Sequence, residues 1–149
     1  MAFEFTLEAL LRYRRTLEEN EQRRLVGLLA RRAALQRQLE QAHDSLRRLQ
    51  TTMLDMLEQP TVSAEIQFAV AQQKAIGEKQ GLLRVDLQRL ATEVAEQSQR
   101  YRTARRQREV LEALRTSQLR VYQARERRRE QARQDELFLL RHGKQAGFA

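Results

Sequence analysis

Apolar residues recur at alternating spacings of three and four along most of the chain, and this pattern constrains the fold more than any other feature. One run extends from Leu25 to Met56, and a second extends from Ile66 to Leu111. A repeat that averages about 3.5 residues over several heptads places a narrow apolar seam along each helix, which is typical of a coiled coil. The second run also contains polar positions, among them Gln73, Gln97 and Arg108. Polar members such as Gln97 loosen the seam and help to fix its register.

The only proline, Pro60, lies between the two runs. Proline ends a helix, and Ser63 just after it is suited to cap a new one. At the ends of the chain, Thr6 can cap the first helix, and Gly143 marks a stop for the second. We expect a helix over about residues 6–58, a turn at about 59–62, a helix over about 63–141 and a short C-terminal tail.

A short turn between two long helices makes them antiparallel neighbours. We therefore predict an all-α fold, a single antiparallel two-helix coiled-coil hairpin over residues 1–149 with a longer second helix that overhangs at the termini end. We expect the overhang to begin near residue 117, where the first helix runs out. An unpaired helix is only marginally stable in water, so we expect this one to become fully ordered against another molecule.

The net charge of +8 is concentrated at the C-terminal end, because residues 100–149 hold fourteen bases and six acids. Arginine, which makes up 25 of the 28 bases, favours bidentate contacts with carboxylates and phosphates. The pattern indicates an acidic partner, which could be protein, nucleic acid or anionic lipid. The alternative is a solvated face that only keeps the protein soluble. The arginines of the overhang that we take as candidates are Arg120, Arg125, Arg127, Arg128 and Arg129.

A second candidate surface lies near the turn. The seam spacing places Phe68 outward on the second helix, with Ala75 one heptad later, and it places Leu54 outward on the first. Exposed apolar residues at the tip of a hairpin could form a docking patch. The alternative is that single exposed apolar residues are ordinary.

No pattern points to catalysis, a cofactor or a metal. The chain has no cysteine, which excludes disulfides and favours a reducing compartment. His43 and His142 have no metal-ligand spacing, and no glycine-rich phosphate loop is present. Neither a signal peptide nor a stretch of about 20 apolar residues occurs, so we expect a soluble intracellular protein that is not an enzyme and has no small-molecule substrate.

Residues 3–19 (FEFTLEALLRYRRTLEE) resemble the opening of the flagellar export protein FliJ family. Residues 105–115 (RRQREVLEALR) and 127–136 (RRREQARQDE) resemble the C-terminal helix of that family. The resemblance implies a non-enzymatic antiparallel coiled coil of the bacterial flagellar type III protein export apparatus. Such a protein is shaped like the central stalk of rotary ATPases and lies in the cytoplasm at the inner face of the membrane.

The partners that the resemblance implies are the hexameric export ATPase, the cytoplasmic domain of the export gate and export chaperones. On this reading the overhang (Arg120, Arg125, Arg127, Arg128, Arg129) contacts the ATPase ring, and the tip (Leu54, Phe68, Ala75) contacts the gate.

Two other functions remain open. An Arg-rich coiled coil can bind nucleic acid, although a bZIP-type protein places its basic region before a parallel zipper rather than after an antiparallel hairpin. The arginine stretch also lacks interleaved aromatic residues for base stacking, apart from Tyr101 and Tyr122. A generic tethering coiled coil is the other alternative, and it predicts stable parallel self-association.

Overall fold

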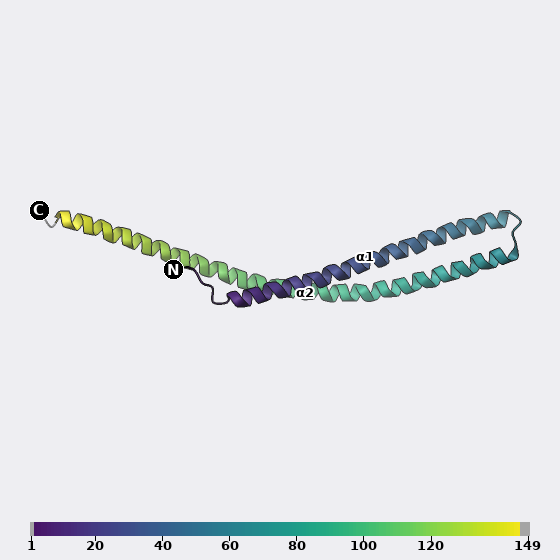
Figure 1. Ribbon diagram of the computed structural model, residues 1–149, viewed down its shortest axis with the longest axis horizontal. Coiled ribbons are helices and arrows are strands. Elements are labelled where there is room, and N and C mark those ends of the chain that lie inside the picture. The colour runs from purple at the N-terminus through teal and green to yellow at the C-terminus, as the bar shows by residue number, and fades with distance from the viewer. Residues whose placement is uncertain (1, 147–149) are drawn as a thin grey trace. The chain divides into compact units, whose positions relative to one another are not determined.

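The computed structural model describes the backbone of residues 2–146 and the side chains of residues 2–143. It contains two helices, α1 (Glu8–Glu58) and α2 (Ser63–Ala146), and no strand in the described residues (Figure 1). The helices run in opposite directions and pack against each other as a hairpin, with α2 the longer of the two. The predicted all-α hairpin is therefore confirmed.

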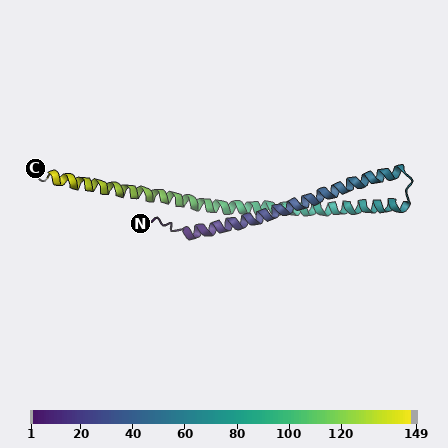
Figure 2. The same cartoon turned by 45° about the horizontal axis from the view of Figure 1, so that its top comes forward.

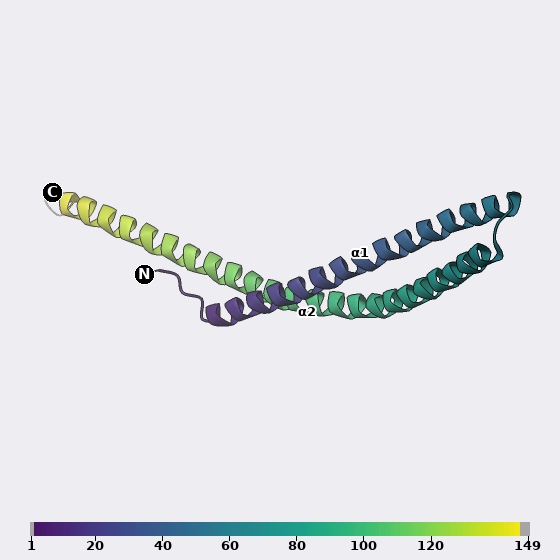
Figure 3. The same cartoon turned by 45° about the vertical axis from the view of Figure 1, so that its right-hand side comes forward.

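The chain forms two compact units, and each helix contributes to both. The turn unit comprises Glu19–Arg102 and contains the connection between the helices. The terminal unit pairs the described residues up to Glu18 with those from Thr103 onward. Within the turn unit, the two helix segments run side by side from the connection (Figures 2 and 3).

The predicted seams form the interface between the helices. In α1, every predicted seam position from Leu25 to Met56 is buried or half-buried. In α2, the seam supplies most of the buried apolar side chains, namely Ala69, Leu83, Leu90, Val94 and Ala104. Ile66 and Gln73 are exceptions, because both are exposed in the part of α2 that follows the turn. The seam is therefore least covered near the turn, where burying polar Gln73 would gain little.

The turn is stabilised by a residue that the spacing did not single out. The Thr61 hydroxyl donates to the Met56 carbonyl oxygen at 2.9 Å and lies 3.0 Å from the Gln59 carbonyl oxygen. Met56 lies in the last turn of α1, where carbonyls have no partner within the helix. Thr61 therefore stabilises the C-terminal end of α1, and α2 begins at Ser63 as expected.

The outer helix ends differ from the expected ones. The Leu11 N–H donates to the Leu7 carbonyl oxygen, and α1 begins at Glu8 instead of near Thr6. Helix α2 continues to Ala146, past the stop expected at Gly143. Gly143 does not have the positive φ that a helix-ending glycine adopts, so the helix passes through it.

In the terminal unit, the N-terminal residues contact α2 further along that helix than expected. Phe5 is buried, Leu11 is fully buried at 0% exposure, and the rings of Phe3 and Tyr122 lie 5.6 Å apart. The segment that precedes α1 thus continues along α2 after α1 itself has ended. The unpaired part of α2 consequently begins after about residue 126, and the expectation of residue 117 was wrong.

Candidate interaction surfaces

An ionic cluster joins the two helices of the terminal unit. Arg108 forms a bidentate pair with Glu18, with N···O distances of 2.6 and 3.1 Å, and contacts Glu112 at 2.7 Å. Arg15 approaches the same Glu112 carboxylate at 3.1 Å. The side chains of Arg108 and Glu18 are only 20% and 14% exposed. Charge-assisted hydrogen bonds of this kind set the position of one helix against the other.

The cluster also shifts the protonation equilibria of its members. Hydrogen bonds from Arg108, and then from Arg15, hold the pKa of Glu112 below its ordinary value, although partial burial opposes the shift. The hydrogen bond to Glu18, followed by the one to Glu112, raises the pKa of Arg108 against the same desolvation. Both groups therefore stay charged at neutral pH.

Other carboxylates of the terminal unit are paired in the same way. Glu8 accepts a hydrogen bond from Arg115 at 3.1 Å, and Glu109 accepts one from Arg105 at 2.9 Å. These pairs neutralise one acid at the start of α1 and one on the facing part of α2. Residues 103–126 still hold six bases against three acids, and residues 127–149 hold the same numbers, so the excess positive charge is shared equally by these two parts of the chain.

The distal segment of α2, defined here as residues 127–143, is the first candidate site, and all its side chains are exposed. Arg127, Arg128 and Arg129 are consecutive, so they point in three directions about 100° apart around the helix. Arg129 contacts Glu126 at 3.1 Å, and Arg127 donates to the Gln123 carbonyl oxygen at 3.4 Å.

Two of the five candidate arginines lie outside this segment. Arg120 and Arg125 are exposed, but they belong to the part of α2 beside the N-terminal residues. Arg125 lines a groove that also involves Phe3 and Tyr122. Arg120 and Arg125 were assigned to the overhang, and the structure places them in the paired part of the terminal unit instead.

An exposed apolar cluster at the end of the distal segment was not recognised from the sequence. Its four consecutive members are Leu137, Phe138, Leu139 and Leu140. The Phe138 ring lies 4.1 Å from the ring of His142 on the same helix. Four successive residues cover the whole circumference of a helix, so the cluster has no 3–4 spacing for a seam analysis to detect. Its signal is an uninterrupted apolar run after an arginine-rich stretch.

The tip of the turn unit is the second candidate site. Leu54 on α1 is 63% exposed, Phe68 on α2 is 66% exposed, and Ala75 is also exposed, as the spacing predicted. Leu57 and Val62 add further exposed apolar area on either side of the turn. Several large apolar side chains thus surround one turn, and such a concentration marks interaction sites more often than single exposed residues do.

The described residues contain no arrangement suited to holding a metal. No group of three or more His, Asp or Glu side chains comes together in that part of the chain. Between residues 2 and 146, neither helix has a stretch that is apolar enough to cross a membrane.

Comparison with protein-family models, with curated proteins and with solved structures found no match to this chain. The candidate sites therefore rest on the sequence and on the geometry described above.

Proposed function

We propose that the chain is a non-enzymatic component of the bacterial flagellar type III protein export apparatus. In this role the distal segment of α2 binds within the hexameric export ATPase ring, and the tip of the turn unit binds the cytoplasmic domain of the export gate. Export chaperones are further partners, and the protein works at the cytoplasmic face of the inner membrane. The resemblance of residues 3–19, 105–115 and 127–136 to the FliJ family supports this assignment.

The observation that carries the proposal is that two short stretches of the distal segment each present one kind of side chain on every side of the helix. Arg127, Arg128 and Arg129 point to three sides of the helix, and the four apolar residues from Leu137 to Leu140 cover all of its circumference. A helix that is apolar all round is normally buried on all sides. A ring that encloses the helix meets this requirement, whereas a flat surface contacts one side only.

The ring contact is tested by adding the purified protein to a flagellar export ATPase and measuring ATP turnover and hexamer formation. We expect both to increase. The triple variant Arg127→Glu, Arg128→Glu, Arg129→Glu should abolish the increase, because it places acids against an acidic surface. The matched control reverses three exposed arginines of the turn unit, namely Arg23, Arg37 and Arg48.

An unchanged ATPase rate at saturating protein would contradict the proposal. So would a distal-segment variant that stimulates as well as the control does. Leu137→Ser with Leu140→Ser provides a second test, because it removes apolar area without adding charge and should also reduce stimulation.

The gate contact is tested separately by titrating the cytoplasmic domain of the export gate protein with the full chain. We expect Phe68→Ala and Leu54→Ala to weaken binding by about tenfold or more, as loss of a buried large apolar side chain does. Val85→Ala, which alters an exposed apolar residue elsewhere in the turn unit, is the control. Equal affinities for all three variants would exclude the tip as the gate contact.

Nucleic-acid binding is the second candidate, and the consecutive exposed arginines favour it. Titration with duplex DNA over a salt series distinguishes the two functions, because the logarithm of the affinity for phosphates falls steeply and linearly with the logarithm of the salt concentration. We expect only weak binding, since Tyr122 lies against Phe3 and the distal segment has no tyrosine or tryptophan and one phenylalanine, Phe138, for stacking.

A further inference from the structure

A second apolar stripe runs along α2 in the terminal unit, beside the seam. Its apolar members are Val110, Leu114 and Val121, and Ser117 occupies the remaining position, so the spacings are four, three and four residues. At about 100° per residue, these four positions fall within a narrow sector of the helix, roughly a third of a turn from the seam. The stripe therefore forms a separate face of α2 that repeats at the period of a coiled coil.

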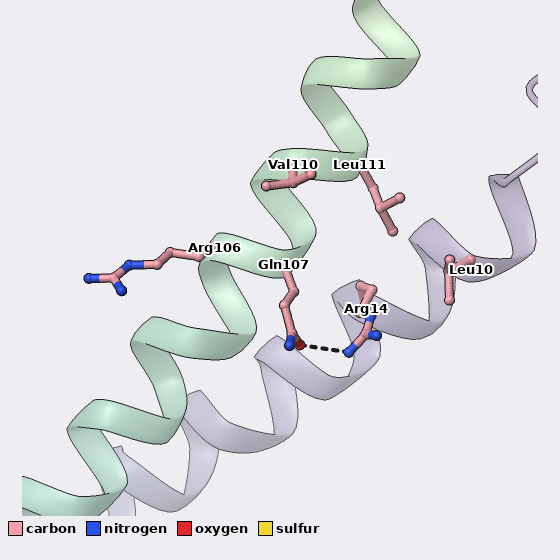
Figure 4. A pocket seen from close by; sticks show the side chains of 6 residues that line it. All are labelled: Leu10, Arg14, Arg106, Gln107, Val110 and Leu111. Atoms are coloured by element: carbon pink, nitrogen blue, oxygen red, sulfur yellow. Dashed lines mark hydrogen bonds between the residues drawn. The ribbon is translucent and has the colours of Figure 1, made fainter.

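Pairing with α1 does not cover this face. Val110 is 67% exposed, Leu114 is 40% exposed and Val121 is 49% exposed. Seam residues one position later, such as Leu111, are half-buried. In Figure 4, Leu111 points toward α1, whereas Val110 projects from another side of α2. Helix α2 thus has one apolar face that meets α1 and a second face without a partner among the described residues.

The unpartnered stripe borders two grooves between α2 and the N-terminal residues. The first groove is lined by Leu10, Arg14, Arg106, Gln107, Val110 and Leu111 (Figure 4). Arg14 donates to the Gln107 side-chain oxygen at 2.6 Å across this groove. The second groove is lined by Phe3, Glu4, Ser117, Gln118, Val121, Tyr122 and Arg125. Val110 and Val121 lie eleven residues apart, so the stripe extends about 16 Å along α2.

The borders of the grooves are mainly cationic. Arg14 and Arg106 border the first groove and Arg125 borders the second, and Glu4 is the acid among the lining residues. The nearby acids of α2 do not offset these charges. Glu109 pairs with Arg105, and Glu112 pairs with Arg108 and Arg15. An occupant with acidic residues beside its apolar face would complement this border.

We propose that the terminal unit binds a third helix along this stripe. The occupant is an amphipathic helix of another protein, with Leu, Ile or Val at positions i, i+4, i+7 and i+11 and with Asp or Glu beside them. It lays its apolar residues along Val110, Leu114 and Val121 and places its acids near Arg14, Arg106 and Arg125. A second copy of this chain fits less well, because its own stripe has the same cationic borders.

This inference does not depend on the proposed ATPase partner, because the stripe lies outside the distal segment. Failure to stimulate the ATPase would contradict the ring contact but not the third-helix site. Failure to bind the helical peptide would contradict the third-helix site but not the ring contact. The two sites are separated by testing Val110 variants for peptide binding and Arg127–Arg129 variants for ATPase stimulation.

The test uses a fluorescent, hydrocarbon-stapled helical peptide with leucine at i, i+4, i+7 and i+11 and glutamate beside each leucine. We expect saturable binding to the full chain that weakens as salt is raised. Val110→Glu and Val121→Glu should each weaken binding at least about tenfold, because each places a carboxylate in the apolar contact. The control Val85→Glu, at an exposed valine of the turn unit, should bind the peptide as the unaltered chain does.

A second peptide with lysine in place of glutamate should bind at least about tenfold more weakly. Equal binding of the two peptides, absence of saturable binding, or insensitivity to both valine variants would overturn the proposal. Self-association that Val110→Glu abolishes, measured by sedimentation, would show that a second copy occupies the stripe and would also overturn it. If circular dichroism shows that Val110→Glu has lost helix, Val110→Ser replaces it in the binding assay and should likewise weaken peptide binding.

Discussion

Arg108 is the most consequential single residue in the terminal unit. It lies at a seam position, where an apolar side chain would ordinarily be found, and it connects Glu18 of α1 with Glu112 of its own helix. A charged group in a seam usually costs stability and specifies the register. Here the cost is offset because two carboxylates satisfy the guanidinium.

We expect Arg108→Met to lower the free energy of unfolding by about 1–3 kcal/mol, because it leaves the partly buried Glu18 carboxylate without its partner. Urea unfolding followed by circular dichroism measures the change. The control is Arg106→Met, which removes an exposed arginine and should change stability by less than about 0.5 kcal/mol. Equal stability of the two variants would show that the cluster contributes nothing to folding.

The same cluster predicts a pH dependence. The pKa of Glu112 is lower in the folded chain than its ordinary value of 4.5, so the folded state binds fewer protons than the unfolded state as the pH approaches 4.5. Its contribution to stability is therefore complete above that value and is lost as the pH falls through the folded pKa. Glu112→Gln should be less stable than the unaltered chain at pH 7, and the gap should close at acid pH. A gap that stays constant down to pH 3 would contradict this assignment.

The sequence located Arg108 in the seam but could not identify its partners. Which carboxylate on α1 it meets depends on the register between two helices, and a change of one residue would exchange Glu18 for Glu19 or Leu17. The tip residues were more accessible to sequence reasoning, because outward positions follow directly from heptad spacing. The exposed states of Leu54 and Phe68 were therefore predicted correctly.

At the level of the helices, the seam spacing predicted the two helices and their contact, whereas the extent of pairing near the ends of the chain depended on other features. The seam and the break at Pro60 are local patterns, so both helices and their antiparallel pairing could be predicted. The extent of pairing near Tyr122 could not be predicted, because it depends on the segment before α1, which has no helical repeat of its own. The apolar run Leu137–Leu140 was missed for the related reason that it fills every side of the helix.

The interior glycines of α2 limit the stability of the turn unit. Gly77 and Gly81 are exposed, and a Cβ added at either would have no neighbour within 4 Å. We expect Gly77→Ala and Gly81→Ala each to stabilise the chain by about 0.5–1 kcal/mol, because alanine loses less backbone freedom in a helix. Thermal unfolding should show a higher midpoint for each variant and a larger increase for the double variant. An unchanged midpoint would indicate that these turns of α2 are not helical in solution.

At the level of the whole molecule, the charge and the unpartnered surfaces are distributed unevenly. The net charge of +8 arises from residues 100–149, and the exposed distal segment belongs to that stretch. The acids nearest to the helix pair of the terminal unit are occupied by internal ion pairs. The apolar seam and these ion pairs hold the helices together, whereas the arginines and the apolar cluster of the distal segment remain exposed and available to a partner. The function proposed for the chain depends on this division.

The most direct test of the intramolecular hairpin, on which the proposed function depends, is whether residues near the start of the chain lie against α2 within one molecule. The chain has no cysteine, so spin labels can be placed at Arg14→Cys and Gln107→Cys without further changes. The side chains of Arg14 and Gln107 form a 2.6 Å hydrogen bond. An intramolecular hairpin predicts a short distance between the labels, within about 20 Å, that is unchanged on dilution with unlabelled protein. A single uninterrupted helix would separate the labels by about 140 Å. A distance of that order, or a short distance that disappears on dilution, would contradict an intramolecular hairpin.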